Sequence, residues 1–179
     1  MTYKWIYKTP PQFDDILINS DGESLTGLWF DKSKDAAKHN ADCEKKELDV
    51  FRDTCRWLDI YFHGKQPDFI PKYKIEKLTD FKKEVINIMN DIPFGETVTY
   101  NDIAKRIAES RGIERMSAQA VGGAVGSNPI CIIVPCHRVV GSNGSLTGYG
   151  GGIKNKEALL KHENTDMSKF YIPKKGTAL

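Results

Sequence analysis

Short apolar runs separated by turn residues open the chain. Ile16–Ile18 and Leu25–Phe30 have the length and composition of strands. Asp14-Asp15 and Asp21-Gly22, which stand before them, are residue pairs typical of turns. The pattern between Tyr3 and Asp31 therefore predicts a small antiparallel sheet.

An amphipathic helix is predicted after this sheet. Apolar residues recur at steps of three and four, at Leu48, Phe51, Cys55, Leu58 and Phe62. This spacing places them on one helical face. We expect the face, including Cys55, to cover the sheet and to join its core.

A break in the pattern separates the two halves of the chain. Residues 63–71 contain one glycine and two prolines, and we expect a linker there. A domain boundary near Lys77 gives an N-terminal domain of residues 1–77 and a C-terminal domain of residues 78–179. The predicted fold class is α+β, with a small antiparallel sheet and a helix followed by a mainly helical domain.

Three helices are predicted after the boundary. Thr79 can cap the first, whose apolar stripe is Phe81, Val85, Ile88 and Met89. Thr99 and Asp102 form a capping box that opens the second, and Arg111-Gly112 can end it. Its inward-facing residues are Ile103, Ala104 and Ile107. Ser117 can cap the third, and the pair formed by the second and third helices is typical of a DNA-binding helix-turn-helix.

The third of these helices, Ala118–Gly126, is unusually poor in side chains. It holds three glycines and three alanines, and each glycine costs about 1 kcal/mol relative to alanine. Small residues let a helix backbone approach another surface closely. That surface could be a neighbouring strand or a DNA groove, and opposite faces of the helix could serve both.

The apolar run Ile130–Val134 predicts a buried strand that ends at Pro135, because proline cannot donate to a continuing ladder. Asn128-Pro129 forms the turn before it. Ser142-Asn143-Gly144 predicts a hairpin. A last helix is predicted over Lys154–Glu163, and Lys174–Gly176 reads as a frayed tail.

Composition adds little about partners. The formal net charge is +2, with 13 basic against 14 acidic residues over 1–77 and 13 against 10 over 78–179. If the C-terminal half binds DNA, its affinity should come from a few well-placed cations and backbone amides.

No apolar run approaches the ~20 residues of a membrane span, and residues 1–5 lack the apolar core of a signal peptide. We expect a cytoplasmic protein.

The four cysteines, at positions 43, 55, 131 and 136, have no zinc-ribbon spacing. We expect them to remain thiols. A metal site built from His39, Cys43, Cys55 and His63 matches no known ligand spacing. We therefore expect neither a metal nor another cofactor.

Cys136 stands beside His137 and Arg138 directly after the apolar run. A thiol becomes a strong nucleophile only as thiolate, and a neighbouring imidazole or cation can lower its pKa. The alternative is an inert, buried cysteine that packs as a small apolar residue. The cysteine and histidine alone do not decide between the two.

The blocks around this motif are more specific. Val121–Pro129 precedes Pro135–Val139, and Gly144–Tyr149 and Leu159–Glu163 follow it. In this order and at this spacing they closely resemble the O6-alkylguanine-DNA alkyltransferases, over roughly residues 81–163. The resemblance implies a ribonuclease H-like N-terminal domain. It also implies single-turnover transfer of a methyl or other alkyl group from O6-alkylguanine, and from O4-alkylthymine, to Cys136 of the protein itself.

The resemblance also implies a set of catalytic roles. Cys136 is the acceptor, His137 deprotonates it through a water, and a buried Glu163 holds the histidine. Such an arrangement of nucleophile, base and orienting acid occurs in unrelated enzymes. A solvated residue in the last helical turn is the alternative for Glu163, but an acid is disfavoured there by the helix dipole.

Roles in reading the base follow from the same family. Tyr100 hydrogen-bonds the flipped base, although it could instead pack on its own helix. The carbonyls of Cys136 and Val139 and the N–H of Gly150 contact guanine, and Tyr149 walls the alkyl pocket. Arg138 ties the loop down. Base flipping is needed because the reactive atom is otherwise stacked within the duplex.

The implied DNA contacts lie on the glycine-rich helix. Ala120, Gly122 and Gly123 enter the minor groove, and Asn128 is the hinge between the helix-turn-helix and the reactive loop. Gln119 stands where the family commonly has an arginine that fills the gap left by the flipped base. Arg115 lies four residues earlier and could supply a charge.

Three other functions compete with this one. They are a binding-only relative that recognises alkylated DNA, a Cys/His hydrolase and a plain helix-turn-helix regulator. The first class lacks the cysteine, the second needs an oxyanion hole, and the third leaves Cys136-His137 unexplained. We expect a monomer that acts on double-stranded DNA carrying alkylated guanine.

Overall fold

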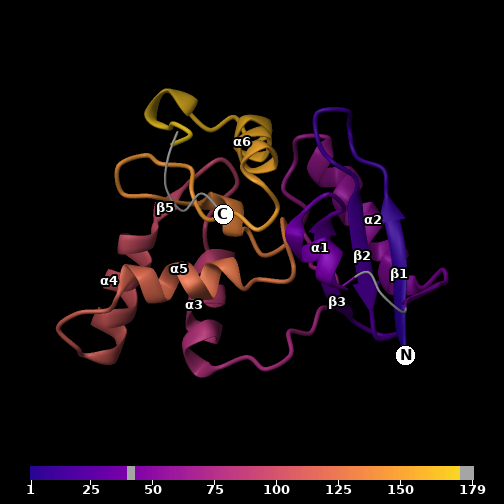
Figure 1. Cartoon of the computed structure of the whole chain (residues 1–179), viewed down its shortest axis with the longest axis horizontal. Helices are drawn as coiled ribbons and strands as arrows, with labels where there is room; N and C mark the ends of the chain where they lie inside the picture. The colour runs from indigo at the N-terminus through magenta and orange to yellow at the C-terminus, as the bar shows by residue number, and fades with distance from the viewer. Residues whose placement is uncertain (40–42, 174–179) are drawn as a thin grey trace. The chain divides into compact units, whose positions relative to one another are not determined.

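The computed structural model describes residues 1–39 and 43–173, which form two compact units (Figure 1). The first contains residues 1–76 and the segment 129–133. The second contains residues 77–128 and the described residues from 134 onward. The predicted tail Lys174–Gly176 lies outside the described residues.

A four-stranded sheet in the order β3-β2-β1-β4 forms the first unit. Its strands are β1 (Thr2–Tyr7), β2 (Ile16–Ser20), β3 (Leu25–Phe30) and β4 (Cys43–Lys45). The first three pair antiparallel, as predicted, but β4 runs parallel to β1. The sheet is therefore mixed. Helix α1 (Lys34–His39) stands between β3 and β4 in the sequence, and a parallel neighbour requires such a crossover.

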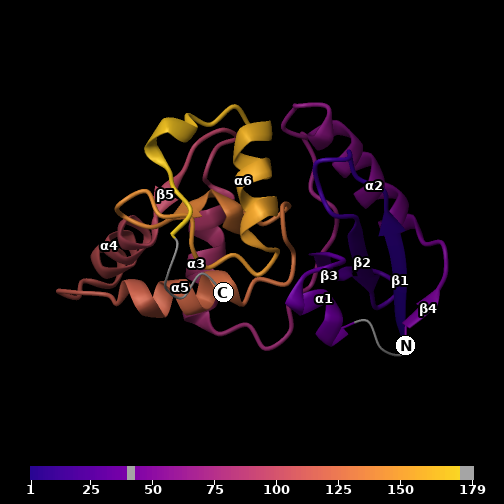
Figure 2. The ribbon, with the colours of Figure 1, turned by 45° about the horizontal axis from the view of Figure 1, so that its top comes forward.

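Helix α2 (Asp49–Phe62) covers one face of this sheet (Figures 1 and 2). Phe51 stacks on Trp5 of β1 with ring centroids 6.4 Å apart. The buried face is Val50, Phe51, Thr54, Trp57, Leu58 and Tyr61. It is rotated from the predicted stripe, so the expectation of a core position for Cys55 was wrong: Cys55 is half-buried. The aromatic rings at 57 and 61 bury more apolar area than a thiol, and they set the rotation.

The second unit begins with the three predicted helices. They are α3 (Asp80–Asn90), α4 (Tyr100–Arg111) and α5 (Ala118–Gly126). Thr79 caps α3, Thr99 and Asp102 form the capping box of α4, and Ser117 caps α5, all as predicted. On α3 the buried residues are Val85, Ile86 and Met89, whereas the predicted Phe81 and Ile88 are only partly covered.

The prediction of a strand over Ile130–Val134 was wrong. Only Ile130 bridges to β3, at Leu28. Ile132 has a φ of 68°, and the N–H of Ile133 turns back to the carbonyl of Cys131 at 2.8 Å. A left-handed residue cannot continue a strand. The run is apolar because all five residues are buried, and burial needs no ladder.

The elements after the run are short. A 3-10 helix (Cys136–Arg138) leads into β6 (Val139–Val140), which pairs parallel with β5 (Val98–Thr99). The predicted hairpin at Ser142-Asn143-Gly144 was wrong beyond its turn, because no strand between the turn and residue 173 pairs with β6. Helix α6 (Ile153–His162) and a second 3-10 helix (Met167–Lys169) complete the unit.

Candidate active site

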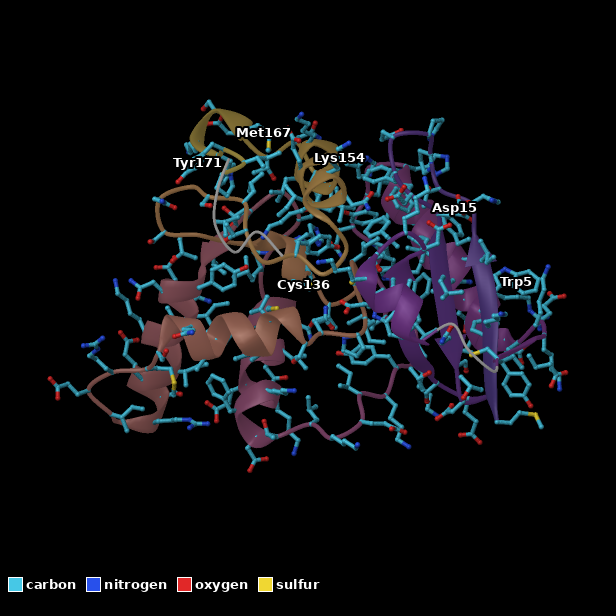
Figure 3. The ribbon with its side chains drawn as sticks, viewed as in Figure 1. Trp5, Asp15, Cys136, Lys154, Met167 and Tyr171 are labelled. Atoms are coloured by element: carbon cyan, nitrogen blue, oxygen red, sulfur yellow. The ribbon has the colours of Figure 1, made fainter. Side chains whose placement is uncertain are left out.

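Cys136 lies at the start of the 3-10 helix, in a segment that runs between α5 and α6 (Figures 1 and 3). It is 5% exposed. Its N–H bonds to the carbonyl of Val134 at 2.8 Å. This tight turn, and not a strand end, points the thiol into the unit.

Asn128, two residues after α5, donates to the thiol. Its Nδ2 lies 3.1 Å from Cys136 Sγ and 3.0 Å from the Val134 carbonyl oxygen. Both side chains are buried. An amide donor at this distance favours the thiolate over the thiol, because an anion is the better acceptor.

His137 and Glu163 form a second buried contact in the site. Nε2 of His137 lies 2.7 Å from Oε1 of Glu163, and neither side chain has any exposed area. Nδ1 of His137 has no hydrogen-bond partner within the described residues. Burial lowers the pKa of His137, although Glu163 raises it. The imidazole is therefore neutral, with an open nitrogen that can accept a proton.

Arg138 contributes a cation to the same carboxylate. Its Nε and Nη2 bind the two oxygens of Glu163 at 2.9 and 3.0 Å, and its Nη1 donates to the carbonyl of Ile92 at 2.7 Å. Burial alone raises the pKa of Glu163, but His137 and Arg138 outweigh it and hold that pKa far below its usual range. Glu163 is ionised.

Tyr100 and Lys156 meet at one carbonyl. The Tyr100 hydroxyl and Nζ of Lys156 each lie 3.0 Å from the oxygen of Thr147, and Lys156 also donates to the carbonyl of Val139 at 2.6 Å. Burial, followed by the nearby charge of Cys136, raises the pKa of Tyr100 to about 12. Tyr100 thus reaches away from its own helix and stays a proton donor.

Gly148 is required at this point. Its φ is +69°, and a Cβ there would lie 3.0 Å from the Tyr100 hydroxyl. A side chain would both strain the backbone and push Tyr100 off the Thr147 carbonyl. The glycine after Thr147 therefore permits the contact between two distant segments.

The predicted site residues fall into two groups. Most line the buried site just described: Tyr100, Asn128, Cys136, His137, Arg138, Val139, Tyr149 and Glu163, with Gly150 half-covered beside them. The rest lie on or next to α5, where Gln119, Ala120 and Gly123 are exposed and Gly122 is half-buried. Arg115 is exposed in the loop before α5 and lines a hollow of about 590 Å³ that Lys105 and Ser117 also line.

The sequence interpretation missed Lys156. Its side chain has no exposed area, and burial lowers its pKa to about 8. Nζ lies 6.0 Å from the ring centroids of both Tyr100 and Tyr149. Spacing could have identified it, because Lys156, Leu159, Leu160 and Glu163 fall on one face of α6.

Neither a metal cluster nor a membrane span is found in the described parts of the chain. No three His, Cys, Asp or Glu side chains gather there as ligands would, and the side chain of His39 lies outside those parts. None of the helices in the described ranges combines the length and apolar composition that a membrane crossing needs.

Known proteins resemble both units. Residues 80–165 match the family model of the DNA-binding domain of 6-O-methylguanine DNA methyltransferase, and residues 3–70 match that of its ribonuclease-like domain. Methylated-DNA–protein-cysteine methyltransferase of Methanosarcina acetivorans is 41% identical over 163 residues, which is 91% of this chain and 99% of the relative. The Haemophilus influenzae protein of that name is 37% identical over 166 residues, 91% and 88% of the two chains.

Solved structures agree. The crystal structure of Mycobacterium tuberculosis O6-methylguanine methyltransferase is 34% identical with a TM-score of 0.73, over 98% of this chain and 97% of that one. A structure of the same organism's protein in complex with DNA gives 33% identity and a TM-score of 0.71, over 94% of both chains. The predicted fold class and the predicted family are thus confirmed, and the chain belongs to the methylated-DNA–protein-cysteine methyltransferases.

Proposed function

We propose that this protein repairs DNA by moving an alkyl group from O6 of guanine to Sγ of its own Cys136, once per molecule. The observation that carries this role is the position of the thiol. It is buried, it accepts a hydrogen bond from Asn128 at 3.1 Å, and its sequence neighbour His137 is held by Glu163 at 2.7 Å. These contacts support the roles of nucleophile for Cys136, base for His137 and orienting acid for Glu163.

The reaction begins with the loss of the thiol proton. His137 has an open Nδ1, and one water can carry the proton from Sγ to that nitrogen. Glu163 then stabilises the imidazolium through Nε2. Because Asn128 donates to Sγ, the thiolate forms next to a fixed dipole that stabilises its charge.

The thiolate then attacks the alkyl carbon. A bond forms between Sγ and carbon while the bond between carbon and O6 breaks, and the electron pair stays on guanine. Tyr100 can donate its proton to a ring nitrogen of the departing base, and water reprotonates its phenolate as His137 gives the thiol proton back to solvent. In the resting site the Tyr100 proton is held by the Thr147 carbonyl. The thioether that results cannot lose its alkyl group easily, so each molecule acts once.

Recognition involves both groups of site residues. We assign the carbonyls of Cys136 and Val139 and the N–H of Gly150 to the flipped guanine, and Tyr149 to the wall of the alkyl pocket. A carbonyl has two lone pairs, so Val139 can serve the base while it accepts from Lys156.

We assign the contact with DNA to the uncharged, exposed face of α5. Gln119, Ala120 and Gly123 are exposed and Gly122 is half-buried, which suits close approach to a minor groove. Asn128 joins this helix to the thiol. We assign the DNA-binding and acceptor roles to residues 78–179 and a supporting role to residues 1–77, in a protein that acts as a monomer.

A single experiment separates this function from its competitors. The protein is incubated with duplex DNA that carries O6-methylguanine, and its intact mass and its peptides are measured by mass spectrometry. The proposal requires one methyl group per chain on the peptide that contains Cys136. Binding without a mass change would favour a binding-only protein, whereas product formation beyond one per chain would favour a hydrolase.

A further inference from the structure

Arg138 is fixed more firmly than a loop anchor requires. All three of its guanidinium nitrogens are engaged: Nε and Nη2 by Glu163, and Nη1 by the carbonyl of Ile92. The ring of Phe94 lies 5.8 Å from the guanidinium carbon. The side chain is 5% exposed. A planar fork in this geometry fixes the orientation of its carboxylate as well as its position.

The carboxylate of Glu163 is consequently shared. Oε1 accepts from Nε2 of His137 at 2.7 Å and from Nη2 of Arg138 at 3.0 Å. Oε2 accepts from Nε of Arg138 at 2.9 Å and from the N–H of Gly95 at 3.1 Å. His137 therefore shares Oε1 of Glu163 with Arg138. The charge of that carboxylate is already balanced by the guanidinium.

We propose that Arg138 is a positioning residue for alkyl transfer, which orients Glu163 and offsets its charge so that His137 stays neutral and can accept the proton of Cys136. This inference rests on the proposed function. It goes beyond the role of loop anchor, because it assigns the guanidinium an effect on the base.

The physical argument is a competition between charges. If Glu163 faced His137 alone in this buried site, protonating the imidazole would be the simplest way to compensate the anion. A histidine that is permanently protonated cannot act as a base. The Arg138 cation compensates the negative charge of Glu163 in place of a proton on His137, since a guanidinium stays charged at every pH at which the protein is folded.

Two further groups affect the protonation of His137. One opposes it, as Arg138 does, and the charge of the other depends on its own protonation state. Lys156 is a second buried cation that opposes protonation, and Cys136 is negative only as thiolate. Burial is the largest cause that lowers the pKa of His137. Glu163 raises that pKa, and Arg138 and Lys156 lower it. Removing Arg138 should therefore raise it.

The test measures transfer to the protein from O6-methylguanine supplied as a free base, which avoids effects on DNA binding. Rate constants are followed from about pH 5 to about pH 9 for wild type, Arg138→Gln and Arg138→Lys. In wild type the rate falls as the pH drops through the pKa of His137. In Arg138→Gln this fall should occur about one pH unit higher. Arg138→Lys keeps the charge and should keep the position of the fall, even if its plateau is lower.

The titration of the His137 ring by NMR provides a second measurement that does not depend on activity. It should move upward in Arg138→Gln, stay near wild type in Arg138→Lys, and move downward in Glu163→Gln, which lacks the anion. Arg111 forms a similar fork with Glu84, at 2.9 to 3.3 Å, in a half-exposed place. Arg111→Gln is therefore the matched control and should move neither readout.

Each outcome decides the question. A uniform loss of rate in Arg138→Gln with no shift along the pH axis would make Arg138 purely structural and overturn the inference. If Arg138→Gln does not fold, a His137 titration that moves upward in Arg138→Lys would overturn it as well, because the charge is still present. If wild type itself transfers no methyl group to Cys136, the proposed function fails, and the two failures are thus distinct.

Discussion

The nucleophile depends on side chains from three separate segments of the second unit. Asn128 follows α5, His137 adjoins the cysteine and Glu163 caps the end of α6. Asn128 donates to Sγ, whereas the hydrogen bond of Glu163 is to His137. Each can therefore be removed separately, and the loss of the thiol itself is the simplest case.

Cys136→Ala should abolish methyl transfer and leave duplex affinity within a few-fold of wild type. The thiol is the acceptor, and Asn128 keeps its second partner, the Val134 carbonyl, when Sγ is gone. Intact mass after incubation with methylated DNA measures the first effect, and a binding titration measures the second. Retained methylation would move the acceptor to the buried Cys131.

Lys156 makes a prediction about pH. Burial lowers its pKa from 10.5 to about 8, so the unfolded chain binds more protons than the folded one between these values. Stability due to this group therefore rises as the pH increases from about 8 to about 10.5, and the full destabilisation is present below pH 8. Lys156→Met should lack this rise, so its stability relative to wild type should fall by up to about 3 kcal/mol across that window.

Urea unfolding at the two ends of the window measures this difference. Lys154→Met removes an exposed lysine from the same helix and serves as the control. A difference between wild type and Lys156→Met that does not change with pH would mean that Lys156 is charged in both states. The sequence interpretation missed this residue, although its spacing places it on the same face of α6 as Leu159 and Leu160, because lysine is rarely buried.

At the scale of elements, local signals predicted the helices well. Thr79, Thr99 and Ser117 each cap a helix as expected, because capping depends on bonds within four residues. The strand predicted over Ile130–Val134 was wrong, because an apolar run indicates burial and does not show that the segment pairs with another strand. The fourth strand was also missed: β4 has only three residues, and half-buried Cys43 is its least exposed.

Helix α5 provides a test of why its glycines are present. A Cβ at Gly123 would meet nothing within 4 Å, and the residue lies on the exposed face. Gly123→Ala should raise the free energy of unfolding by up to about 1 kcal/mol, because alanine is the better helix former. The same methyl group should weaken duplex binding if this face approaches DNA closely.

Thermal unfolding and a duplex binding titration give the two quantities. Transfer from the free base, which needs no DNA contact, is the internal control and should not change. A variant that is more stable and binds duplex DNA as well as wild type would contradict the close approach. The glycines would then need another explanation within the unit.

At the scale of the whole molecule, charge is the weakest of the signals for DNA binding. The net charge is only +2, and the exposed face of α5 carries no charged residue among its helical positions. Family resemblance predicted the function where composition could not, since it compares the order and spacing of several motifs. Affinity for duplex DNA should therefore depend on few cationic contacts and respond weakly to salt.

Gln119→Arg changes this balance by one charge at an exposed position near the start of α5. A guanidinium can fill the gap left by a flipped base and can also reach the phosphate field, which an amide cannot. The slope of log affinity against log salt should steepen by roughly one unit, and duplex binding should tighten about tenfold at low salt.

Gln66→Arg is the control: it makes the same substitution in the loop after α2, so the two variants have the same net charge. If both variants steepen the slope alike, the effect is one of overall charge. If only Gln119→Arg does so, residue 119 contacts DNA, and if neither does, Arg115 becomes the better candidate for the inserted side chain.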